Sequence, residues 1–104
     1  MNQLQKLTTR VQEVRDRYKK EFPEIRMDRD YLPLKLSEEW GECMQAYLML
    51  SDRGRQKGKT KAQMRVALRE ELADVFGYLL LFAAHEKVDL DEALEKKWFA
   101  YLKK

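Results

Sequence analysis

The stretch ELADVFGYLLLFAA, residues 71–84, decides the fold class of this chain. It opens with two acidic residues three positions apart and continues through ten residues without a charge, from Val75 to Ala84. Together with its flanks, this pattern predicts a helix over about 61–87, and a helix that is apolar all round has to be buried on every side. The chain is therefore predicted to be all-α, with this third helix at its centre.

Three further helices are predicted from apolar residues that recur at spacings of three and four. The first ends near Pro23 and the second runs over about 33–51, with Asp30 as its expected cap. The fourth follows a break at Val88, where Asp89 and Glu92 have the spacing of a capping box. The repeating residues are Leu4, Leu7, Val11, Val14 and Tyr18 in the first helix, Leu36, Trp40, Cys43, Tyr47 and Leu50 in the second, and Leu90, Ala93, Leu94, Trp98, Tyr101 and Leu102 in the fourth.

These elements predict a single domain over residues 1–104 with a four-helix, bundle-like arrangement of mainly antiparallel neighbours. A chain of 104 residues buries only a modest share of its surface when it folds alone. An even-numbered homo-oligomer is therefore expected to complete the fold. Aromatic side chains either pack in the core, which is the commoner role, or stack on a base; the candidates are Trp40, Trp98, Phe22, Tyr31 and Tyr47.

Composition narrows the function classes. The 21 Lys and Arg residues against 18 Asp and Glu residues leave a net charge of +3, which predicts no stable nucleic-acid binding. No uncharged run approaches the ~20 residues that a membrane span needs, and the N-terminus lacks the apolar core of a signal peptide. A cytoplasmic protein is the default expectation. Cys43 is the one cysteine in the sequence, so no internal disulfide is possible, and a buried thiol is expected.

Two short acidic motifs carry the chemistry: EEWGE at residues 38–42 and ELAD at residues 71–74. Residues three apart share a helix face, so Glu39 and Glu42 form one pair of carboxylates, and Glu71 and Asp74 form another. Where the two pairs converge, their repulsion calls for a cation. Oxygen-only ligands favour Mg²⁺, with Mn²⁺ as a substitute, and His85 falls outside both motifs, which argues against a di-iron bundle.

The order and spacing of the motifs, EExxE then ExxD with 28 residues between them, resembles the signature of MazG-like all-α nucleoside-triphosphate pyrophosphohydrolases. This resemblance implies that Glu39, Glu42, Glu71 and Asp74 are magnesium ligands and that Glu38 is an outer-shell or water-orienting carboxylate. It also implies a nucleoside-triphosphate substrate, cleavage between the α and β phosphates with release of pyrophosphate, and assembly as homodimers or homotetramers.

Three residues are candidates for substrate binding. Lys35 lies four residues before Glu39 and is expected either to reach a phosphate or to form an ordinary ion pair with Glu39. In the family that the motifs resemble, a later helix contacts phosphate or sugar, and Lys97 and Tyr101 occupy that region here. The asparagine expected beside them is not evident.

Two other interpretations stay open. The chain is alternatively a non-enzymatic helical interaction module, whose third helix pairs with another protein and whose acids are solvated. A nucleic-acid binder that uses the basic loop between Arg53 and Lys61 is the third interpretation, and the small net charge argues against it.

Overall fold

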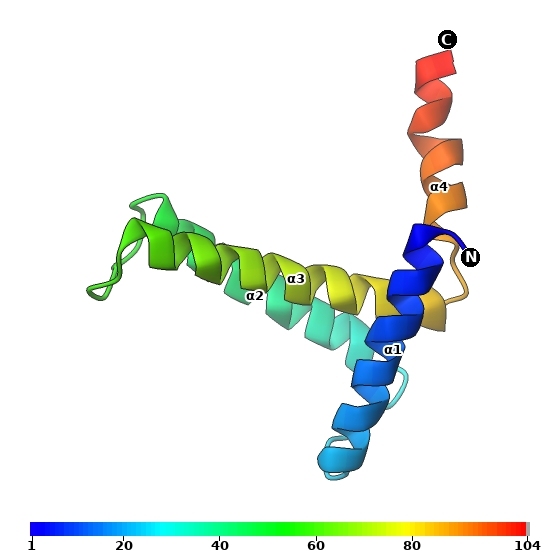
Figure 1. Cartoon of the computed structure of the whole chain (residues 1–104), viewed down its shortest axis with the longest axis horizontal. Coiled ribbons are helices and arrows are strands. Elements are labelled where there is room, and N and C mark those ends of the chain that lie inside the picture. Colours follow the sequence, from blue (N-terminus) through cyan, green and yellow to red (C-terminus); the bar gives the residue numbers. More distant parts are fainter. Residues whose placement is uncertain (104) are drawn as a thin grey trace. The chain divides into compact units, whose positions relative to one another are not determined.

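The computed structural model describes residues 1–103, and the regular structure in that range is entirely helical (Figure 1). The all-α prediction is therefore confirmed. Across the described residues, no helix combines the length and the apolarity that crossing a membrane requires. The elements are α1 (Gln3–Glu21), α2 (Tyr31–Leu50), α3 (Lys61–His85), α4 (Leu90–Lys97) and a short 3₁₀ helix, η1 (Phe99–Lys103).

The chain divides into two compact units, which we describe separately. The hairpin unit is Met27–Leu79 and holds α2 and most of α3. The terminal unit combines Met1–Arg26 with the chain from Leu80 onward, and so holds α1, the last turns of α3, α4 and η1.

In the hairpin unit, α2 and α3 run antiparallel and side by side (Figure 1). At one end the Lys61 ammonium lies 2.8 Å from the carbonyl oxygen of Leu50, where α2 ends and α3 begins. At the other end the Lys35 ammonium lies 5.7 Å from the centre of the Tyr78 ring. Apolar side chains fill the space between the two helices, with Leu32, Cys43 and Met64 buried. The buried thiol predicted for Cys43 is confirmed.

The loop between α2 and α3 holds the residues that the sequence assigned to a solvated connection. Asp52, Lys57 and Gly58 adopt positive φ angles of 63°, 54° and 75°, which reverse the chain direction over a short distance. Thr60 and Gln63 then open α3 with a reciprocal cap: the Gln63 amide donates to the Thr60 hydroxyl at 3.1 Å, and the Thr60 amide donates to the Gln63 side chain at 2.9 Å.

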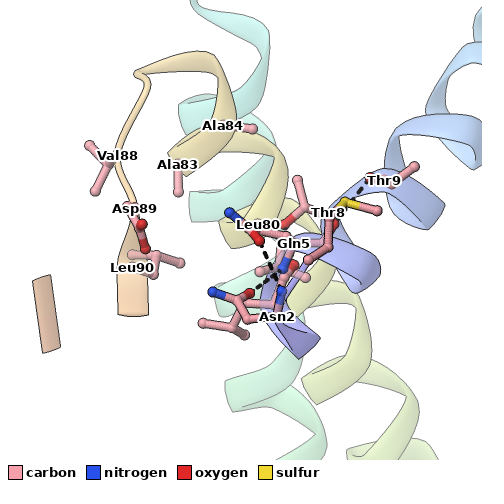
Figure 2. Close-up of a pocket in the computed structure, with 12 residues that line it drawn as sticks. Asn2, Gln5, Thr8, Thr9, Leu80, Ala83, Ala84, Val88, Asp89 and Leu90 are labelled. Atoms are coloured by element: carbon pink, nitrogen blue, oxygen red, sulfur yellow. Dashed lines mark hydrogen bonds between the residues drawn. The ribbon is translucent and has the colours of Figure 1, made fainter. Parts of the chain in front are cut away.

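In the terminal unit, side-chain caps fix the starts of both helices. The Gln5 amide donates to the Asn2 side chain at 2.9 Å and opens α1, and the Glu92 amide donates to Asp89 at 3.2 Å and opens α4. The cap predicted at Asp89 is confirmed. Between these two helix starts and the end of α3 lies an open pocket of about 330 Å³ (Figure 2), lined by the buried residues Leu80 and Ala83 among others.

The structure corrects three details of the predicted elements. Asp30 stands at the start of α2, but its side chain makes no capping hydrogen bond because its own backbone is already helical, at φ −93° and ψ −8°. The third helix ends at His85 instead of at residue 87, because Lys87 turns into a left-handed conformation with φ 58°. The fourth helix ends at Lys97, and the last described residues continue as the 3₁₀ helix.

The prediction that the third helix is buried on all sides is wrong for the single chain. Phe76 is 43% exposed and Leu79 is 37% exposed, because a two-helix hairpin covers only one side of each helix. The predicted core packing is also wrong for Trp40 and Trp98, which are 51% and 68% exposed. Large apolar side chains are thus left in water on both units.

Candidate metal centre

The structure brings the predicted carboxylates together on the hairpin unit. Oxygen atoms of Glu39, Glu71 and Asp74 all lie within 4.8 Å of one another, so α2 and α3 each contribute to one group. A second group with the same spacing consists of Glu38, Glu39 and Glu42. Glu39 belongs to both groups, whereas Glu42, which was predicted to share one site with Glu71 and Asp74, is grouped only with Glu38 and Glu39. We call the five residues the carboxylate cluster.

Burial sets two members of the cluster apart. Glu39 is only 8% exposed, and its Oε2 atom is shielded from solvent without a hydrogen-bond partner. The Oε2 atom of Glu71 is likewise shielded from solvent and has no hydrogen-bond partner. An ionised carboxylate that loses water and gains no partner is strongly destabilised. These two oxygens therefore leave a need for positive charge inside the cluster.

The titration of both acids reflects this environment. Burial, followed by the negative charges of Glu42 and Asp74, raises the pKa of Glu39 above its ordinary value. Burial, followed by the same two neighbours, likewise raises the pKa of Glu71. Each shift means that the folded chain disfavours the charged form of these side chains, and a bound cation reverses that preference.

Lys35 supplies part of the missing charge from within the chain. Its ammonium lies 2.5 Å from Glu38 Oε1 and 3.5 Å from Glu39 Oε1. The hydrogen bond to Glu38 is the largest cause that raises the pKa of Lys35, so this side chain stays protonated. The structure thus shows the ion pair expected as one role of Lys35, and phosphate binding remains a prediction.

Two further side chains lie close to the cluster. Cys43 is fully buried, and burial followed by the charge of Glu71 raises its pKa, so its thiol is neutral and unreactive. Burial and then a hydrogen bond with Tyr31 raise the pKa of Tyr78, which therefore remains a neutral phenol. Tyr78 was not predicted from the sequence, although it follows Asp74 by four residues and hence shares its helix face.

The donor set suits a hard divalent ion. Within residues 1–103, both groups that are able to hold a cation contain carboxylates only, and the one histidine, His85, is in neither. Mg²⁺ prefers oxygen ligands and retains several waters, which suits the exposed members Glu42 and Asp74. The unpartnered oxygens of Glu39 and Glu71 supply the buried side of such a site.

The other predicted substrate residues belong to the terminal unit. Lys97 ends α4 and Tyr101 lies in η1, and with Trp98 they line a shallow depression on that unit. Neither is a member of the carboxylate cluster. Their contact with phosphate or sugar stays a prediction.

Comparison of the chain with protein-family models, with curated proteins and with solved structures finds no match.

Proposed function

We propose that the chain is a magnesium-dependent hydrolase that converts nucleoside triphosphates, including deoxynucleotides, to nucleoside monophosphate and pyrophosphate. The observation that supports it most is the pair of buried, unpartnered oxygens on Glu39 and Glu71. These two side chains come from different helices, and their carboxylates belong to one group whose oxygens lie within 4.8 Å of one another. The choice of nucleotide and of the α–β bond comes from the resemblance of the EExxE and ExxD motifs. Control of the nucleotide pool or removal of altered nucleotides is the corresponding cellular role.

In this proposal Glu39, Glu42, Glu71 and Asp74 hold the metal, with Mn²⁺ as a substitute. When bound, the ion offsets the charge that develops on the phosphates. Glu39, which is buried, and the half-buried Glu71 fix its position, whereas exposed Glu42 and Asp74 leave sides open to phosphate and water.

Glu38 has a different task. It is more exposed than Glu39, and Lys35 contacts its Oε1 atom. The Oε2 atom is then left to orient a water or to accept its proton. Lys35 binds the phosphates directly once it is released from its acidic partners. Lys97 and Tyr101 are the proposed substrate contacts from the terminal unit.

Assembly as a homodimer or homotetramer is part of the proposal. Around the helix axis, Trp40 lies about 100° from Glu39, and Leu72 lies about 100° from Glu71. Glu42 and Asp74 are rotated from the same two acids in the opposite direction. On two antiparallel helices these rotations place Trp40, Leu72 and Phe76 together on the side of the hairpin away from the exposed acids. All three are exposed by more than 40%, and a second copy would bury them.

A panel of nucleoside triphosphates with Mg²⁺, analysed by chromatography, tests the activity. The expected products are monophosphate and pyrophosphate, and Glu42→Gln and Asp74→Asn are expected to abolish turnover while the helical circular dichroism signal is retained. Glu70→Gln is the matched control, because this exposed acid adjoins the cluster without belonging to it. Diphosphate plus phosphate would show that another bond is cut, and full activity in both cluster variants would remove them from the mechanism.

The same exposed apolar side chains favour a second candidate function, a non-enzymatic helical interaction module. No turnover across the panel, together with stable binding of another protein through Trp40 and Phe76, would support this alternative. Metal-dependent turnover contradicts it.

A further inference from the structure

One cationic side chain is folded back onto the carboxylate cluster. Lys35 has a long, flexible side chain that is free to extend into water, yet its ammonium lies 2.5 Å from Glu38 and 3.5 Å from Glu39. Its side chain is only 28% exposed, and the Tyr78 ring lies on a further side of the ammonium, 5.7 Å away. Lys35 is therefore held among three groups from two helices.

The acidic partners of Lys35 are also candidate metal ligands. Glu38 and Glu39 belong, with Glu42, to one of the two groups whose oxygens are spaced to hold a cation. The Oε1 atoms that face Lys35 thus belong to the same side chains as the oxygens that a divalent ion would use. A singly charged ammonium and a doubly charged ion cannot both stay there without repulsion.

We infer that Lys35 is the resident counter-ion of the carboxylate cluster, and that a divalent cation competes with it for Glu38 and Glu39. Binding of the ion releases the ammonium, which then extends toward the oxygens of an incoming triphosphate. Metal therefore binds first and prepares the lysine for the nucleotide. This inference rests on the proposed function only in taking the cluster to be a metal site.

Titration of the nucleotide-free protein with Mn²⁺ alone, followed by the electron paramagnetic resonance signal of free Mn²⁺, tests the competition. Lys35→Met is expected to bind Mn²⁺ about tenfold more tightly than the wild type, because in the wild type the ion must first break the attraction between the Lys35 ammonium and Glu39, which lie 3.5 Å apart. Lys61→Met is the matched control. Lys61 also pairs with a carboxylate, Asp52, but precedes Glu71 by ten residues of α3, about 15 Å, so its affinity is expected to change less than twofold.

A second measurement follows Lys35 in the wild-type protein, in case the variant does not fold. The Lys35 methylene groups nearest the ammonium are expected to shift in nuclear magnetic resonance spectra as Mg²⁺ is added, while those of Lys61 stay in place. Equal or weaker Mn²⁺ binding by folded Lys35→Met, or a Lys35 signal unmoved by saturating Mg²⁺, would overturn the inference.

The outcomes separate this inference from the proposed function. Tighter Mn²⁺ binding by Lys35→Met without any nucleotide turnover would support the counter-ion role of Lys35 and reject the hydrolase function. Turnover by the wild type, with unchanged Mn²⁺ affinity in the variant, would support the hydrolase function and reject the counter-ion role of Lys35. A wild-type chain that binds no Mn²⁺ would reject both.

Discussion

Replacing Glu39 with glutamine is expected to stabilise the metal-free protein and to remove its response to Mg²⁺. Glu39 is the acid shared by the two carboxylate groups, so its oxygens lie within 4.8 Å of oxygens of all four other acids: Glu38, Glu42, Glu71 and Asp74. Each such repulsion is worth about 0.9 kcal/mol in water, and the attraction of Lys35 at 3.5 Å offsets about 1.2 kcal/mol. The net repulsion is roughly 2 kcal/mol, to which the burial of an unpartnered charge adds.

Removing that charge should raise the melting temperature in EDTA by about 8–16 °C, since about 1 kcal/mol corresponds to about 4–8 °C for a domain of this size. The assay is thermal unfolding followed by circular dichroism, with EDTA and with saturating Mg²⁺. The wild type should gain stability from Mg²⁺, and Glu39→Gln should gain almost none. Glu95→Gln, an exposed acid on α4, controls for the change in net charge. A Glu39→Gln protein that melts lower than the wild type in EDTA and still responds to Mg²⁺ would refute the reasoning.

Three further predictions concern pH, capping and assembly. Folding raises the pKa values of Glu39 and Glu71 above 4.5. Just above that pH the folded chain therefore binds more protons than the unfolded chain. The metal-free protein thus loses stability as pH rises from about 4.5 through the raised values. Mg²⁺ should therefore stabilise it more at pH 8 than at pH 5 in thermal unfolding, and equal gains at both values would contradict this. Asp89→Ala should cost about 1 kcal/mol in urea unfolding, because it removes the cap from the Glu92 amide, and an unchanged midpoint would mean that the cap contributes nothing. Phe76→Glu should shift light scattering toward a smaller species, because a charge replaces an exposed apolar side chain, and an unchanged mass would place the interface elsewhere.

Helix periodicity was sufficient to predict the number of helices and most of their bounds. The four predicted helices are present, and the acids at spacings of three share a face as the 3.6-residue repeat requires. The spacing within each motif thus predicted which carboxylates meet. Their convergence across two helices was an expectation from packing. The structure brings Glu39, Glu71 and Asp74 into one group, whereas Glu42 is grouped only with Glu38 and Glu39.

Other features depend on tertiary contacts that periodicity does not encode. The apolar run at 75–84 predicted burial on every side, but a single hairpin leaves Phe76 and Leu79 half exposed. The role of Lys35 was open between phosphate and ion pair. Its contact with Glu38 follows from the i, i+3 spacing, but only the fold brings the Tyr78 ring of α3 to 5.7 Å from its ammonium. The capping box of Thr60 and Gln63 was present in the sequence with its usual spacing and was missed.

Anomalous diffraction from crystals of the wild-type protein grown with Mn²⁺ tests the central claim most directly. The account predicts a manganese peak within coordination distance of carboxylate oxygens from Glu39, Glu71 and Asp74, and no such peak at this position in Glu39→Gln crystals. A fully loaded crystal whose manganese lies away from these three residues, with their side chains turned into solvent, would contradict it.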